Sequence, residues 1–183
     1  MKPEMSSTEE ILLKLSRDLK NGAHLHKKLP NSYVNKVLKK DLKLRKFRGV
    51  FPCDRMKTLR EGESMILNTD PHYLEGKHFV ALTRQNGQII YFDSLAERLD
   101  VHFPELFKEL SRKRMFPLMH VLNLPIQAPD SNFCGIFCID YILCLYSPFS
   151  NVRTMKYELH PFNLKKNDEI CLKNVIRKLK VRK

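Results

Sequence analysis

The chain has 183 residues, 43% of them hydrophobic, which suits one globular domain with a sizeable core and excludes a disordered chain. No apolar stretch approaches the roughly 20 residues that a membrane-spanning helix needs. The first ten residues are polar and charged, and no apolar signal-peptide core follows them. We therefore expect a protein of the cytosol or nucleus without membrane contacts. The formal net charge of +13 points to polyanionic partners.

The excess positive charge is concentrated in two segments of the chain. Basic clusters attract nucleic-acid phosphates without reading base sequence, although either cluster alone is equally compatible with a solvated face. No zinc-finger or RNA-recognition signature accompanies them, so we predict affinity for DNA without base readout, with RNA or an acidic protein as open alternatives. The predicted contacts are Lys36, Lys39, Lys40, Lys43, Arg45, Lys46 and Arg48 in the first cluster and Arg177, Lys178 and Lys180 in the second.

Taken in chain order, the first elements are two helices and two short strands. Residues 8–20 have apolar positions at helical spacing and an acidic first turn, which predicts a helix. A second, basic helix is expected to be capped at Asn31 or Ser32 and to extend to Leu42. Residues 48–53 and 64–68 are predicted to form short strands.

Residues 77–95 are predicted to form a β-hairpin. Two β-prone segments flank Asn86-Gly87, the dipeptide typical of a two-residue type I′ turn. A turn at this position fixes the register of the two strands. The expected facing pairs are Gln85 with Gln88, Leu82 with Tyr91, and Val80 with Asp93.

This register brings a histidine and a carboxylate together. Side chains alternate between the two faces of a strand, so His78 lies on the same face as Val80. His78 and Asp93 are then diagonal neighbours, with backbones about 7–8 Å apart. A carboxylate that accepts a hydrogen bond from an imidazole fixes its tautomer and stabilises its charged form.

The second half of the chain is predicted to be mainly helical. A surface helix is expected at 104–113, a strand at 120–127 and a loop at 128–133. Residues 134–146 are apolar on almost every side, which is typical of a buried helix. A basic amphipathic helix begins at Asn167. Without repeats or long linkers, we expect residues 1–183 to form a single α+β domain.

Cys134 is the strongest candidate nucleophile. It follows a Ser131-Asn132 capping signal and opens the buried helix, where the positive end of the helix dipole favours a thiolate. The cysteines lack metal-type spacing, so we expect free thiols and no metal site. Gln127 follows the predicted strand, and its amide is expected to help the Cys134 N–H bind an oxyanion. The other cysteines are expected to be core residues: Cys53, Cys138, Cys144 and Cys171.

These residues occur in an order that resembles a known family. The segments SMILNTDPHYLEGKHFVAL, FDS and IQAPDSNFCGIFCIDYIL are similar to the adenovirus-type cysteine endopeptidases, the adenain family. The most specific part runs without a gap from Gln127 to Cys138, and the similarity is clear over roughly residues 45–147. The source implied is an adenovirus or a virus-like element such as a Polinton.

The resemblance implies a fold and a function. The implied fold has a central mixed sheet, flanking helices and the nucleophile at the start of a buried helix. His78 would be the general base, Asp93 its orienting acid, Cys134 the nucleophile and Gln127 part of the oxyanion hole. The implied activity is cleavage of viral or element-encoded precursors after a Gly-containing consensus during virion maturation, stimulated by DNA. Independently of the resemblance, a monomer is our default expectation. The implied location is the virion and host nucleus, or the host cytoplasm if assembly occurs there.

Two departures from the family pattern keep alternatives open. The acid is Asp93, where adenain has Glu, and Asp is also the acid of SUMO-deconjugating proteases. The family attaches an activating peptide through a cysteine between the acid and the glutamine, and no cysteine lies between Asp93 and Gln127. A covalent activating peptide is therefore not expected, whereas a non-covalent one is left open. No metal or small-molecule cofactor is expected. The alternatives are a protease that removes SUMO or another ubiquitin-like modifier, and a nucleic-acid-binding virion protein with an inactive protease fold.

Overall fold

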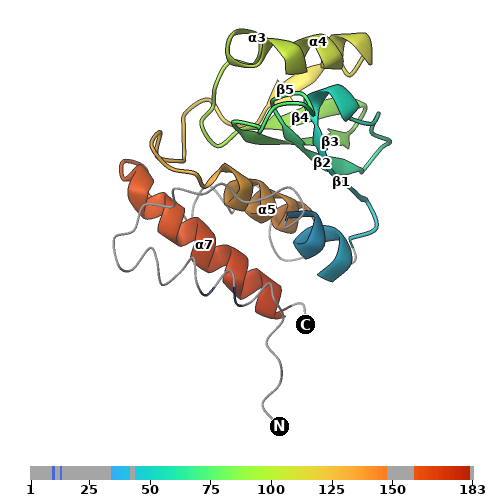
Figure 1. Ribbon diagram of the computed structural model, residues 1–183. Helices are drawn as coiled ribbons and strands as arrows, with labels where there is room; N and C mark the ends of the chain where they lie inside the picture. The colour runs from blue at the N-terminus through green and yellow to red at the C-terminus, as the bar shows by residue number, and fades with distance from the viewer. Residues whose placement is uncertain (1–9, 11–12, 14–33, 42–43, 148–158, 182–183) are drawn as a thin grey trace.

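The protein has a central mixed sheet, in a computed structural model that describes residues 10, 13, 34–41, 44–147 and 159–181 (Figure 1). The five strands lie in the spatial order β1-β2-β3-β4-β5. The outer pairs β1/β2 and β4/β5 are parallel, and the two inner pairs are antiparallel. The strands are β1 (Phe47–Pro52), β2 (Ser64–Asn68), β3 (Phe79–Gln85), β4 (Gln88–Phe92) and β5 (Leu118–His120).

Helices cover both faces of the sheet. Figure 1 shows α3 and α4 on one side of the strands and α5 and α7 on the other. In the described part of the chain, no helix is both long and apolar enough to cross a membrane. The helical elements are η1 (Lys36–Asp41), η2 (Cys53–Arg55), α3 (Leu99–His102), α4 (Pro104–Arg112), α5 (Cys134–Leu145) and α7 (Leu164–Val181).

The sheet separates two apolar cores because side chains alternate along each strand. Leu82 and Tyr91 belong to the cluster that includes Leu106 and Leu110 of α4. Their strand neighbours, Ala81 and Phe92, belong to the cluster built around α5. The Phe92 ring stacks on Tyr141 of α5 at a centroid distance of 4.4 Å, so α5 is fixed directly against the sheet.

The hairpin has the predicted turn and register. Asn86 and Gly87 both have positive φ, 52° and 74°, as a type I′ turn requires. The pairs Gln85–Gln88 and Leu82–Tyr91 face each other as expected. The ladder ends at Ala81 and Phe92, so Val80 and Asp93 lie just beyond the paired residues.

Most predicted helices are present with small changes in their bounds. The helix expected at 104–113 is α4, and the helix expected from Cys134 is α5. The C-terminal helix, α7, begins at Leu164 rather than Asn167. The second predicted helix appears as the π-helical segment η1. Almost all of the helix predicted at 8–20 lies outside the described residues, as do the caps predicted at 31 and 32.

The strand predicted at 120–127 is wrong. Only Leu118–His120 pairs with the sheet, as β5. Farther along, the N–H groups of Ile126 and Gln127 both donate to the carbonyl of Ser94, at 2.9 and 3.1 Å, instead of joining a strand ladder. These two hydrogen bonds hold Gln127 against the end of β4, next to Asp93 and Ser94.

Candidate active site

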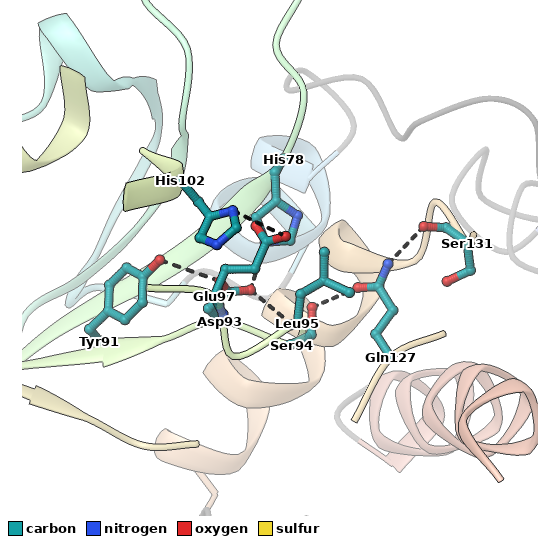
Figure 2. A network of polar contacts seen from close by, with 9 residues as sticks. All are labelled: His78, Tyr91, Asp93, Ser94, Leu95, Glu97, His102, Gln127 and Ser131. Carbon is teal, nitrogen blue, oxygen red and sulfur yellow. Dashed lines mark hydrogen bonds and ion pairs between the residues drawn. The ribbon is translucent and has the colours of Figure 1, made fainter. Parts of the chain in front are cut away.

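His78 and Asp93 form a buried hydrogen-bonded pair at one end of the β3–β4 hairpin. His78 immediately precedes β3, and Asp93 immediately follows β4. The His78 Nε2 and Asp93 Oδ1 atoms are 2.6 Å apart, with the two side chains 7% and 1% exposed (Figure 2). The diagonal pairing inferred from the sequence is therefore confirmed, and the imidazole is oriented through Nε2.

The Asp93 carboxylate is itself fixed by several donors. Its Oδ1 accepts the Leu95 N–H at 2.9 Å, and its Oδ2 accepts the Glu97 N–H at 3.1 Å. The Tyr91 hydroxyl lies 3.5 Å from Oδ2. These contacts, drawn in Figure 2, surround the Asp93 carboxylate with hydrogen-bond donors, two of them backbone N–H groups of the turn after β4.

The surroundings of His78 favour its charged form. One ring face stacks on Phe103, with centroids 5.5 Å apart. Burial acts to lower the pKa of His78, but the interactions with Asp93 and with the nearby Cys134 outweigh it and raise this pKa to about 10. The neighbours of the imidazole therefore favour its charged form.

The backbone ahead of His78 is also constrained. The His78 carbonyl accepts the Thr69 N–H at 3.0 Å. Gly76 has a φ of 83°, and a Cβ placed there would lie 1.6 Å from the Asn68 Nδ2. Only glycine at position 76 leaves room for the Asn68 side-chain amide. The loop that precedes His78 is therefore held in place by close packing against its backbone.

Cys134 is the first residue of α5 and is 3% exposed. The predicted cap is wrong, because the N-cap residue is Phe133 and no side chain caps the helix. The α5 N-terminus still directs its dipole towards Cys134, without a competing side-chain acceptor on its first N–H groups. All five cysteines are free thiols, and Cys134 is close enough to His78 to raise the pKa of its imidazole.

The remaining cysteines behave as core residues. Burial raises the pKa of Cys138 and of Cys171 well above the ordinary thiol value. Burial also raises the pKa of Cys53 to about 11. These thiols are poor nucleophiles at neutral pH, as predicted from their apolar surroundings.

Gln127 lies beside the nucleophile loop and is 1% exposed. Its Oε1 accepts the Ser94 hydroxyl at 2.6 Å, and its Nε2 donates to the Ser131 carbonyl at 2.8 Å (Figure 2). Sequence reasoning identified Gln127 but missed Ser94. The available signal was its place in the FDS segment, directly after the acid and at the end of a strand.

The first turns of α7 support the loop between Gln127 and Cys134. Lys165 forms an ion pair with Asp130, with a distance of 3.4 Å between Nζ and Oδ2. Asp168, also in the first turns of α7, is 4% exposed. Burial raises the pKa of Asp168 to about 7, and the nearby Asp130 adds to the effect.

Eight of the ten predicted DNA-binding residues fall into three groups. Arg45 and Lys46 are exposed beside β1, while Arg48 forms an ion pair with Glu63 and Lys39 donates to the Arg48 carbonyl. Lys43 lies outside the described residues, and only the backbone is described for Lys36, Lys40 and Lys180.

Lys178 has a different role from the one predicted. Its Nζ lies 2.7 Å from the Asp140 Oδ1 and 3.0 Å from the Cys144 Sγ, and its side chain is 15% exposed. Lys178 therefore joins α7 to α5 across a buried interface and is removed from the set of DNA contacts. Its neighbour Arg177 donates to Asn174 on the same helix at 3.2 Å.

The residues described in the structure contain no group of three or more His, Cys, Asp or Glu side chains placed to hold a metal ion. The site brings together a thiol, an imidazole and a carboxylate, from Cys134, His78 and Asp93. Such a set of side chains performs nucleophilic and acid–base chemistry.

Comparisons with known proteins give limited information. No protein-family model matches the chain, and no curated protein matches its sequence. Among solved structures, a deletion variant of AvrA, with IP6 and CoA, is similar at a TM-score of 0.47 and 16% identity, over 96% of this chain and 81% of that chain. At this level of similarity, the function rests on the geometry of the site.

Proposed function

We propose that this chain is a cysteine endopeptidase with an adenain-like fold. The observation that carries the proposal is the buried imidazole of His78, which contacts Asp93 at 2.6 Å and lies near Cys134, the first residue of α5. An imidazolium beside the sulfur stabilises the thiolate, which is the nucleophilic form of cysteine.

The proposed reaction begins with acylation of the enzyme. The Cys134 thiolate attacks the scissile carbonyl carbon, forming a C–S bond and an oxyanion. The Cys134 N–H and the second N–H of Gln127 Nε2 stabilise this oxyanion, because the first N–H of that amide is used by the Ser131 carbonyl. His78 then gives its proton to the amide nitrogen, the C–N bond breaks, and the amine leaves.

Deacylation uses the same residues in the reverse sense. Neutral His78 takes a proton from water, and the resulting hydroxide attacks the thioester. The C–S bond breaks, which releases the carboxylic acid product and regenerates the thiolate–imidazolium pair. Asp93 accepts the hydrogen bond of His78 Nε2 and thereby stabilises the imidazolium in both steps.

The substrate proposal rests on the family resemblance. We infer that the enzyme cleaves precursor proteins of a virus or virus-like element after a Gly-containing consensus, in the virion or host cell. The competing activity, removal of a ubiquitin-like modifier, has one feature in its favour, since Asp93 is the acid that deconjugating proteases use. A Gly-containing precursor peptide and a SUMO fusion assayed side by side distinguish the two activities.

The catalytic proposal is tested by iodoacetamide labelling at mildly acidic pH. Wild type is expected to be alkylated rapidly and at Cys134 alone, and His78→Ala is expected to lower the rate by at least about tenfold. His102→Ala is the matched control, because His102 belongs to the same polar network but is 49% exposed and pairs with Glu97. Slow modification spread over several cysteines would favour the inactive, nucleic-acid-binding alternative.

Stimulation by DNA is tested separately. Arg45 and Lys46 are both exposed, so reversing both charges should weaken DNA binding with little effect on folding. Peptide cleavage by wild type is expected to rise with added DNA and to fall again as salt increases. Lys108→Glu on the exposed face of α4 is the control, and an equal loss in both variants would argue against a specific basic surface.

A further inference from the structure

Ser94 links the two halves of the candidate site. It follows Asp93 directly, and the two residues are 0% and 2% exposed. Asp93 contacts His78, whereas the Ser94 hydroxyl donates to the Gln127 Oε1 at 2.6 Å (Figure 2). Consecutive residues at the end of β4 therefore contact both the base and the oxyanion candidate.

The contacts of Gln127 determine which end of its amide faces which neighbour. A primary amide accepts at oxygen and donates at nitrogen, and a half-turn exchanges these ends. The Ser94 hydroxyl proton faces Oε1, and the Ser131 carbonyl faces Nε2 at 2.8 Å. The reversed amide would oppose two oxygens at Ser131, so the Ser131 carbonyl selects this orientation, in which the Ser94 hydroxyl holds the Oε1 end.

We propose that Ser94 is a positioning residue that holds the Gln127 amide with its nitrogen available to the oxyanion. The inference rests on the proposed function, in which Gln127 is an oxyanion donor. Because Nε2 carries two hydrogens and Ser131 takes one, the second can donate to the substrate. Loss of the Ser94 hydroxyl removes one of the two hydrogen bonds that fix the position of the amide, and leaves it held at Nε2 alone.

The hydroxyl can be removed without disturbing the surrounding backbone. The Ser94 carbonyl accepts the N–H groups of Ile126 and Gln127, at 2.9 and 3.1 Å, and alanine keeps both bonds. Ser94→Ala is therefore expected to leave the fold, the His78–Asp93 pair and Cys134 in place.

The test separates nucleophilicity from oxyanion binding in the full-length chain. In alkylation by iodoacetamide, the Cys134 sulfur displaces iodide and no oxyanion forms. A short peptide aldehyde ending in glycinal instead adds the sulfur to its carbonyl carbon, and the resulting oxyanion needs the hole. Ser94→Ala is expected to keep the alkylation rate within about twofold, while kcat and aldehyde affinity fall by about tenfold, the value of one buried hydrogen bond.

A double-mutant cycle shows whether Ser94 acts through Gln127. In a Gln127→Ala background, Ser94→Ala is expected to have no further effect on kcat. Ser111→Ala, at an exposed position on α4, is the control. Three outcomes would overturn the role of Ser94. They are a Ser94→Ala variant with the kcat of wild type, a double variant whose loss of kcat is the full sum of the two single losses, and a loss of alkylation rate in Ser94→Ala as large as its loss of kcat. A wild type that is neither alkylated nor active would overturn the proposed function as well.

Discussion

Replacing Asp93 by Asn tests how the carboxylate controls His78. Asp93 accepts the N–H of Leu95 on one oxygen and the N–H of Glu97 on the other. Asparagine has one acceptor, so its NH₂ group must face one of these donors. If it replaces Oδ1, it also faces His78 Nε2, which must then accept a hydrogen bond and leave the ring proton on the nitrogen nearer Cys134.

The expected magnitude follows from the raised pKa of His78. Its pKa rises from 6.5 to about 10, which corresponds to ~4–5 kcal/mol in favour of the imidazolium. Asp93 is the largest cause of the rise, and one hydrogen bond to a charged group contributes ~2 kcal/mol, or about 30-fold in rate. The wrong tautomer adds to the loss, as in serine proteases, where it costs about 10⁴-fold. We expect kcat/KM to fall by about 10²–10³-fold.

The assay is a pH profile of peptide cleavage. Imidazolium is needed to protonate the leaving amine, so wild-type activity should persist to about pH 10 and fall above it. In Asp93→Asn the alkaline limb should move at least about one unit towards neutral pH, because the pKa of His78 falls. The raised pKa also adds stability below pH 6.5 that is lost as pH rises towards 10. Unchanged activity and an unchanged alkaline limb would refute the role of Asp93.

Three further predictions concern the nucleophile and α7. Cys134→Ala should abolish cleavage and retain the wild-type circular dichroism spectrum; residual turnover would point to another nucleophile. Lys178→Met should lower the free energy of unfolding in urea by about 3 kcal/mol, because the buried Asp140 loses its ammonium partner; a loss under about 1 kcal/mol would contradict a tight ion pair. The raised pKa of Asp168 makes the wild-type protein less stable as pH rises from about 4 to 7. Asp168→Asn should therefore raise the free energy of unfolding by about 2 kcal/mol at pH 8 and leave it unchanged near pH 4. Equal stability of the two proteins at both pH values would show that the Asp168 carboxylate is solvated.

The local parts of the site were predictable because short-range rules determine them. Asn86-Gly87 fixes the turn type, the turn fixes the register, and the register places His78 near Asp93. The apolar composition after Cys134 likewise identified α5 as a buried helix. These inferences need only neighbours in sequence and the periodicity of strands and helices.

The missed features depend on contacts between distant segments. Ser94 contacts Gln127 because residues 126–127 do not join a strand ladder. Their N–H groups donate instead to the Ser94 carbonyl, just after β4. The role of Lys178 depends on Asp140, on a helix far away in the sequence. A buried lysine needs a charged partner, and the local sequence does not reveal this partner. From its charge alone, Lys178 was therefore predicted to lie on the surface.

The hairpin register has a consequence for how this chain tolerates change. Deleting one residue at Asn86-Gly87 would remove the two-residue turn, and pairing of the strands would then require β4 to shift by one position, which turns Asp93 to the opposite face of the sheet. A set of single-residue deletions should therefore find the exposed turn as intolerant as the buried site, while point substitutions there remain mild. The length of this turn controls the His78–Asp93 contact from the opposite end of the hairpin.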